Sequence, residues 1–255
     1  MNARKIRSDI AEVPPMSAAG GLDSAARPEV ALNRKSLTEQ LREILEARIV
    51  NGELRPGTRL SEEAIAAEFG ISRSPVREVL AALEREGLAD RVGLRDRRVA
   101  TPTAKFVLDT YETWIILEVN RTFISSQHAT VEDHRRIAQA LTQMQEALAQ
   151  DRPRDYATLA MAFPELLHTG CDNLQLISVL KDFEKYRRWL STLYMGDAHP
   201  SQMELEEHRQ IGQAYIAADL PALTLSIQTH VRKQRDQVLH KLGASGEAGE
   251  AARAA

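Results

Sequence analysis

The sequence predicts a mainly α-helical protein in two parts: three helices closed by a β-hairpin, followed by an antiparallel all-α helical bundle. Two observations support this fold class. Between residues 36 and 101, short amphipathic segments with their own start and stop residues lead into two strand-like segments. From residue 104 onward the strand signals end, and about six helical segments with short connections follow.

The three helices of the first part have clear local boundaries. Ser36 is a good N-cap, and Glu39 three residues later completes a capping box for a helix that ends near residue 51. Two more short helices lie between Ser61 and Gly87, separated by a tight turn at Gly70. Each of these two begins after a serine, which is a favoured N-cap.

The last of these helices opens with a polar cluster of two hydroxyls and two arginines: Ser72, Arg73, Ser74 and Arg77. Helix N-termini favour phosphate, and arginine pairs in a fork with phosphate oxygens or with the guanine edge. A short helix, a tight turn and a helix that opens in this way indicate a helix-turn-helix with its recognition helix. The alternative is an ordinary helical hairpin with a solvated arginine face.

The predicted hairpin follows directly, with strands over 88–92 and 98–101. It is rich in arginine, with Arg95, Arg97 and Arg98 at or beside its turn. Three helices and a basic hairpin are typical of a winged helix-turn-helix, in which the wing reaches phosphates or the minor groove. An ordinary helical hairpin does not account for this wing.

Composition limits the possible functions. The formal net charge of the 255 residues is −3, so any DNA contact must come from a local basic patch. Cys171 is the only cysteine, which excludes an internal disulfide and suits a reducing cytosol. The sequence contains no apolar run near the roughly 18 residues that a membrane helix needs. We therefore expect a cytoplasmic protein without a membrane partner.

The stretch LRPGTRLSEEAIAAEFGISRSPVREVLAALEREGL, residues 54–88, resembles GntR-family transcription regulators of the FadR-like subfamily. The helical part resembles their effector domain more loosely, along its whole length, including Glu207-His208 and His230. The resemblance implies a homodimer that binds double-stranded operator DNA and a small-molecule effector. We expect a repressor, because a dimer represses by occluding a promoter, whereas activation needs a polymerase contact that this sequence does not display. It is not expected to be an enzyme. The DNA contacts it implies are Ser72, Arg73, Ser74, Arg77, Arg95, Arg97 and Arg98.

Composition and periodicity predict the domain limits. We expect a flexible N-terminal arm over 1–33, a winged helix-turn-helix domain over 34–103, an all-α effector-binding and dimerisation domain over 104–243 and a flexible tail over 244–255. The arm could also add DNA contacts. The helices expected in the second domain are 104–127, 131–150, 154–171, 173–195, 201–218 and 221–242.

Two positions depart from the family pattern in the DNA-binding part. Asp96 stands about where the wing usually turns on a glycine, so we expect a reshaped turn with Asp96 in the left-handed region, which Asp tolerates. Glu63 stands where some members place an arginine on DNA, so that contact is expected to be absent.

Many family members bind a divalent metal through one Asp and three His residues. Ala160 and Pro164 stand at the expected positions of the Asp and the first His, which leaves His208 and His230. Two imidazoles are a poor divalent site, since such ions usually take four or more ligands. We therefore expect no metal cofactor, and a pocket in which His208 and His230 donate hydrogen bonds to a carboxylate effector.

Alternatives stay open for this pocket. His168 lies one turn beyond Pro164, and a proline kink could bring it to His208 and His230 to bind Zn²⁺ or Ni²⁺. The protein would then sense a metal or a metal–carboxylate complex. Trp114 could also line the pocket, although a tryptophan at helical spacing is usually core. A metal-dependent enzyme in the bundle would need a fuller ligand set and a general base.

Overall fold

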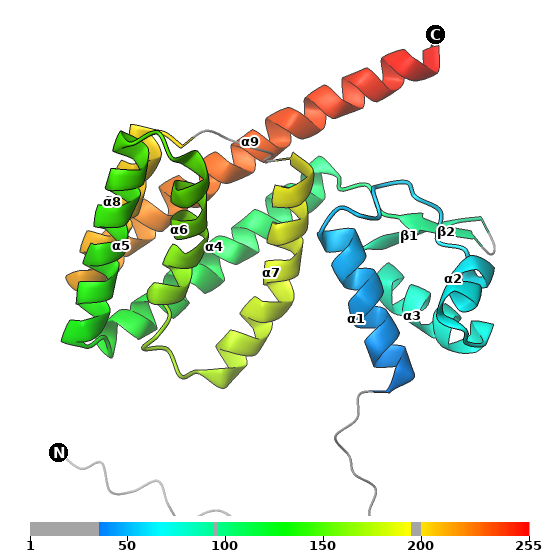
Figure 1. Cartoon of the computed structure of the whole chain (residues 1–255), viewed down its shortest axis with the longest axis horizontal. Helices are drawn as coiled ribbons and strands as arrows, with labels where there is room; N and C mark the ends of the chain where they lie inside the picture. The colour runs from blue at the N-terminus through cyan, green and yellow to red at the C-terminus, as the bar shows by residue number, and fades with distance from the viewer. Residues whose placement is uncertain (1–35, 94–95, 195–199, 255) are drawn as a thin grey trace, which may run out of the picture. The chain divides into compact units, whose positions relative to one another are not determined.

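The computed structural model describes residues 36–93, 96–194 and 200–254, with side chains described as far as residue 243. The predicted arm over 1–33 and Arg95 lie outside the described residues. The elements (Figure 1) are, in chain order, α1 Leu37–Val50, α2 Glu62–Phe69, α3 Arg73–Arg85, β1 Ala89–Val92, β2 Asp96–Val99, α4 Ala104–Gln127, α5 Val131–Ala149, α6 Pro153–Leu166, α7 Leu174–Tyr194, α8 Gln202–Ile216 and α9 Leu220–Ala254. The predicted mainly α fold class is confirmed.

Helices α1, α2 and α3 share one apolar core. The capping box of α1 forms as predicted, with Ser36 N donating to Glu39 Oε2 at 2.7 Å and Glu39 N to Ser36 Oγ at 3.2 Å. Gly70 ends α2 with a φ of 64°, a conformation that glycine adopts without strain. In α3 one stripe is buried at helical spacing, and it consists of Val76, Val79, Leu80 and Leu83.

The wing is an antiparallel pair of strands in which Ala89 lies opposite Val99 and Val92 opposite Asp96. Its turn differs from the prediction. Asp96 is not in the left-handed region but in β2, where its carboxylate accepts from Arg59 Nη2 at 2.8 Å. The positive φ of 73° belongs to Gly93, immediately after β1. Among the described residues of the hairpin, Gly93 has the left-handed conformation that was predicted for Asp96.

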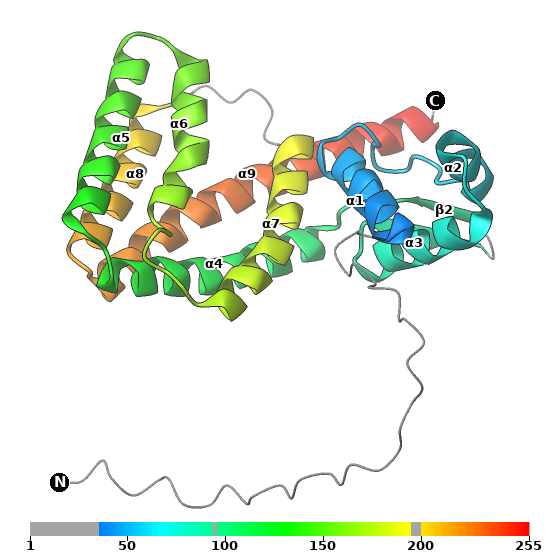
Figure 2. The same cartoon turned by 60° about the horizontal axis from the view of Figure 1, so that its bottom comes forward.

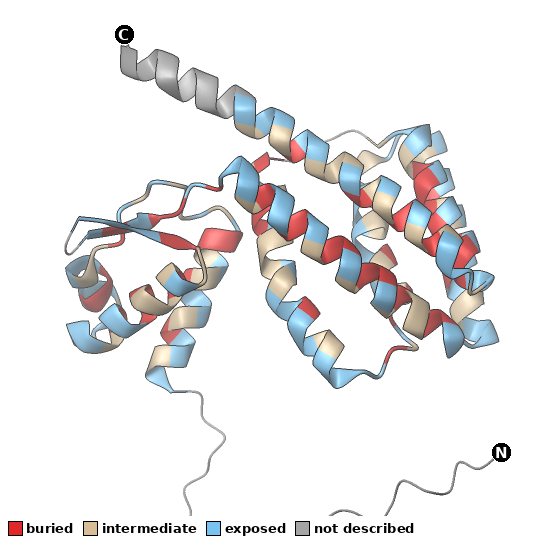
Figure 3. Cartoon of the chain, turned by 180° about the vertical axis from the view of Figure 1, so that it is seen from behind, coloured by how far each residue is buried: buried red, intermediate tan, exposed pale blue. Residues whose placement is uncertain are grey.

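In the helical domain α5, α6 and α8 lie side by side, and α4 crosses against α9 (Figures 1 and 2). The buried positions of α4 recur along its whole length, from Val107 to Ser126 (Figure 3). The core is filled by large side chains from several helices, including Tyr111, Tyr156, Phe163 and Tyr215. Among the described residues, no helix is long and apolar enough to cross a membrane.

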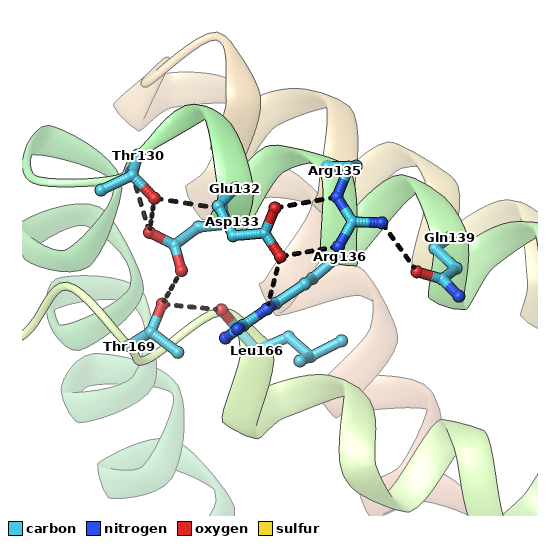
Figure 4. A network of polar contacts seen from close by, with 8 residues as sticks. All are labelled: Thr130, Glu132, Asp133, Arg135, Arg136, Gln139, Leu166 and Thr169. Carbon is cyan, nitrogen blue, oxygen red and sulfur yellow. Dashed lines mark hydrogen bonds and ion pairs between the residues drawn. The ribbon is translucent and has the colours of Figure 1, made fainter.

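The start of α5 is tied to the chain that leaves α6 (Figure 4). Thr130 and Asp133 form a capping box, in which Thr130 N donates to Asp133 Oδ2 at 2.8 Å. The other oxygen of the same carboxylate, Oδ1, accepts from the Thr169 hydroxyl at 3.2 Å. These hydrogen bonds hold the pKa of Asp133 below its ordinary value. One side chain thus caps α5 and positions the segment after α6.

Two helix ends differ from the prediction. Helix α6 ends at Leu166, not at residue 171, and Pro164 lies in its last turn, where the missing N–H interrupts the helical ladder. Helix α9 continues to Ala254, past the predicted end at residue 242, so the segment predicted as a flexible tail is helical. That segment is rich in alanine and glutamate, which are strong helix formers.

Helix α7 contributes to the apolar core of the winged helix as well as to its own domain. Trp189 is fully buried among side chains of α1 and α3. Next to it, the Tyr186 hydroxyl donates to the carbonyl oxygen of Glu86, the C-cap of α3, at 2.9 Å. Lys185 forms an ion pair with the Glu86 carboxylate. The end of the third helix is therefore held by a helix of the second domain.

Candidate DNA-binding surface and effector site

The predicted DNA-contacting side chains at the start of α3 are all exposed: Ser72, Arg73, Ser74 and Arg77. Ser72 is the N-cap, but its hydroxyl makes no capping hydrogen bond, whereas the Ser61 hydroxyl of α2 accepts from Ala64 N at 3.3 Å. The first turn of α3 therefore presents free hydroxyl and amide donors. This is the arrangement in which a helix N-terminus binds a phosphate.

Both arginines of this cluster are held by carboxylates from the first turn of α2. Arg73 Nη2 lies 3.0 Å from Glu63 Oε1, and Arg77 Nη2 lies 3.0 Å from Glu62 Oε2. The hydrogen bond from Arg77 holds the pKa of Glu62 below its ordinary value. The Arg73–Glu63 pair is exposed on both sides, and exposed ion pairs contribute only about 0–1 kcal/mol, so phosphate or guanine can displace Glu63. Neither of these two ion pairs was predicted from the sequence.

The wing arginines have different surroundings. Arg98 is exposed and forms no ion pair within the described residues, so its guanidinium is free for DNA. Arg97 points inward, is 7% exposed and donates from Nε to Glu84 Oε2 at 2.9 Å. Arg97 therefore holds the wing against α3 and does not offer a free guanidinium, unlike the prediction. The strand alternation places these neighbours on opposite faces.

A second polar cluster lies between α6, α8 and α9. The ring centroids of His208 and His230 are 4.9 Å apart. The centroid of the His208 ring also lies 5.3 Å from that of Phe163 and 6.4 Å from that of Tyr156. Glu207 accepts from His230 Nδ1 at 2.9 Å. The two histidines predicted to line a pocket are thus brought together, although they are far apart in the sequence.

The protonation state of His208 follows from its hydrogen bond. Nδ1 lies 2.8 Å from the carbonyl oxygen of Glu204, which can only accept, so Nδ1 carries the proton. Burial, and then the neighbouring His230, lowers the pKa of His208 to about 4. At neutral pH its Nε2 is consequently a bare lone pair. His208 therefore accepts a hydrogen bond there and does not donate one, which corrects the predicted role.

The pKa values of the two carboxylates of this cluster, Glu207 and Glu204, are shifted in opposite directions. Burial raises the pKa of Glu207, but the hydrogen bonds from His230 and Lys233 outweigh it and hold this pKa at about 2. Lys233 Nζ is 2.8 Å from Glu207 Oε1. Burial raises the pKa of Glu204. The hydroxyl of Tyr156 is buried and has no hydrogen-bond partner among the described residues.

This donor set does not fit a divalent metal. Both nitrogens of His230 are engaged, Nδ1 with Glu207 and Nε2 with the Gln234 side chain at 2.9 Å. Ala160 and Pro164 have no ligand atom to offer from α6. Within the described part of the chain, no group of three or more His, Cys, Asp and Glu side chains has the arrangement of a metal site.

The other two predicted pocket residues have other neighbours. His168 lies beyond the end of α6, so the assumed helical face does not exist there, and its Nε2 is 2.8 Å from Glu118 Oε1 of α4. Trp114 is buried in the domain core, with the Arg187 guanidinium 5.1 Å from its ring centroid. His168 therefore pairs with Glu118, and the spacing of these residues in the sequence did not predict this contact.

A winged helix with exposed hydroxyls and arginines at the start of its third helix, joined to an all-α domain, defines the class of helix-turn-helix transcription regulators. Residues 37–95 match the family of bacterial regulatory proteins, gntR family, and residues 109–233 match the FCD domain. The chain belongs to the GntR family, with the helical effector domain of its FadR-like members. It is an effector-responsive DNA-binding regulator and not an enzyme.

Relatives of known name agree with this assignment. The uncharacterized HTH-type transcriptional regulator YdhC of Bacillus subtilis is 28% identical over 78% of this chain and 89% of its own length. The gluconate operon transcriptional repressor of the same species is 43% identical over 29% of this chain and 30% of its own. The solved structure of Escherichia coli McbR/YncC has a TM-score of 0.60 at 17% identity, over 81% of this chain and 99% of that one. At this identity the likeness shows the fold alone.

Proposed function

We propose that the protein is a homodimeric repressor that acts in the cytoplasm on a two-fold operator, and that a small hydroxy carboxylic acid bound in the helical domain changes its DNA affinity. The observation that carries the DNA part is the exposed start of α3, where the Ser72 hydroxyl makes no capping hydrogen bond. Ser72, Arg73, Ser74 and Arg77 lie there together, and Arg98 extends the same basic character to the wing.

Repression and dimerisation rest on simple requirements. A dimer that occupies a promoter blocks it by occlusion alone, whereas activation needs a polymerase contact. The name of the gluconate operon relative, a repressor, supports the same direction. Two copies related by a two-fold axis also match the two half-sites of a palindromic operator.

The effector class follows from the unpaired atoms beside His208. Its Nε2 accepts a hydrogen bond, which a ligand hydroxyl can donate. The buried Tyr156 hydroxyl has no hydrogen-bond partner in the part of the chain that the structure describes, and it can donate to a ligand carboxylate. Lys233, already beside Glu207, is the nearest cation of this cluster. A small acid with both a hydroxyl and a carboxylate satisfies these groups, whereas the same acid without the hydroxyl leaves Nε2 unpaired.

A thermal-shift experiment tests this effector class. Protein treated with EDTA is screened with matched acids, lactate against propionate and malate against succinate, with and without added Zn²⁺ or Ni²⁺. A ligand at about 100 times its Kd stabilises by about 2.7 kcal/mol, which raises Tm by several degrees. We expect stabilisation by a hydroxy acid that metal does not enhance. Stabilisation seen only with metal contradicts the metal-free site, and equal effects of each matched pair contradict the role of the hydroxyl.

Substitutions in the effector site and in the DNA-binding surface should change different properties, the effector response and the DNA affinity respectively. His208→Ala is expected to weaken the effector response and to leave DNA affinity unchanged, since His208 lies in the helical domain and Arg73 in the winged helix. Binding to operator DNA is measured with and without the acid. An effector response that survives His208→Ala contradicts the proposed site.

A further inference from the structure

A carboxylate stands in the proposed DNA-binding surface, next to its leading arginine. The side chain of Glu63 is 76% exposed, and its Oε1 lies 3.0 Å from Arg73 Nη2. Its neighbour Glu62 is different, since it is only 21% exposed and is engaged by Arg77 and Arg97. Glu62 therefore belongs to the framework of the domain, whereas Glu63 is presented to solvent together with Arg73.

Because Glu63 lies so close to Arg73, the two side chains must contact the same region of the DNA. If the start of α3 enters a major groove, Arg73 carries Glu63 to the base edges with it. An ionised carboxylate only accepts hydrogen bonds, and it is repelled by phosphates. The donors on major-groove base edges are the amino groups of cytosine and adenine, and Glu characteristically accepts from cytosine N4. Arginine characteristically donates in a fork to guanine O6 and N7.

We propose that Glu63 is a specificity-determining residue that accepts a hydrogen bond from a cytosine N4 amino group, adjacent to a guanine that Arg73 binds. Each of the two side chains then exchanges its partner in the free protein for a base. The exposed Arg73–Glu63 ion pair keeps both side chains oriented before DNA arrives, and its loss costs little. This inference rests on the proposed function, since it requires that the start of α3 faces the bases.

The competing explanation is that Glu63 only repels phosphate. Repulsion acts on every DNA sequence alike and weakens with salt, because it is a long-range interaction with the backbone. A hydrogen bond to a base acts at one position of the site and changes which base is preferred there. The two explanations therefore differ in the pattern of sequences selected and not merely in affinity.

The test is selection from a randomised double-stranded DNA library with four full-length proteins: the wild type, Glu63→Gln, Glu63→Ala and Glu68→Gln. Glu68 is a matched control, because it lies on the same helix, is 48% exposed and forms its ion pair with Arg48 of α1 at 2.7 Å. Melting curves confirm that each variant is folded. The base preference at every position and the affinity for the winning and for unrelated sequences are then measured.

We expect the wild type and Glu68→Gln to select cytosine at one position of each half-site. Glu63→Ala should lose this preference by about 5- to 100-fold, and Glu63→Gln should shift it toward adenine, to which glutamine hydrogen bonds. If the Glu63 variants select the same bases as the wild type and only bind all DNA more tightly, the inference is wrong while the proposed function stands. A wild type that enriches no sequence overturns the proposed function and this inference with it.

Discussion

Lowering the pH from 7 to 4.5 should cost this protein about 2 kcal/mol of stability through one side chain, His208. In the folded protein its pKa is about 4, because the ring is buried and lies beside His230. In the unfolded chain the ordinary value of 6.5 returns. Between these values the unfolded chain binds a proton that the folded protein does not, so stability is complete above pH 6.5 and falls as the pH drops toward 4.

The magnitude follows from the shift. Two pH units below 6.5, at about 1.4 kcal/mol per unit, set an upper limit of about 3 kcal/mol, and partial protonation of the folded His208 close to its own pKa reduces the loss to about 2 kcal/mol. Glu207, whose pKa is held at about 2, loses its contribution mainly below its ordinary 4.5, and the same loss occurs in a variant that lacks only His208. For a chain of this size about 2 kcal/mol corresponds to roughly 4–8 °C in Tm.

The assay is urea unfolding at pH 7, 6, 5 and 4.5 for the wild type, His208→Gln and His128→Gln. His128 is an exposed histidine at the end of α4 and serves as the control. His208→Gln removes the titrating group, so its stability should fall by about 2 kcal/mol less than that of the other two proteins over this range. An equal fall in all three would refute the assignment of a buried, neutral His208.

Three further predictions concern single side chains. Arg73→Ala should weaken operator binding by about 1–3 kcal/mol if Arg73 contacts a base edge, and an equal loss for all DNA sequences would place it on phosphate. Ser72→Ala should reduce DNA affinity with little change in urea unfolding, because its hydroxyl caps nothing, whereas Ser61→Ala should lose about 1 kcal/mol of stability; equal unfolding losses would contradict this contrast. Tyr156→Phe should leave the free energy of unfolding of the free protein unchanged or slightly higher, since the Tyr156 hydroxyl has no hydrogen-bond partner among the described residues. The same substitution should weaken hydroxy-acid binding in the thermal-shift assay, and unchanged binding would remove Tyr156 from the site.

The winged helix could be predicted from the sequence because its signals are local. Ser36 with Glu39, the turn at Gly70 and the buried stripe of α3 each act within a few residues, and the structure forms all three. The helices of the second domain were predicted to within a few residues wherever caps mark their ends, as at Thr130 for α5. The prediction failed at the end of α6, where Pro164 stops the helix in its last turn.

Periodicity, caps and a family pattern are all read along the chain, so they predicted the fold class, the cluster at the start of α3 and a common location for His208 and His230. Which charged groups neutralise one another became known only from the packing. The tertiary structure placed Glu62 and Glu63 on the arginines of α3, buried Arg97 and engaged His168 with Glu118. Charge pairing, burial and the resulting pKa depend on residues that are distant in the sequence and meet only after packing, so residue type and spacing did not reveal them.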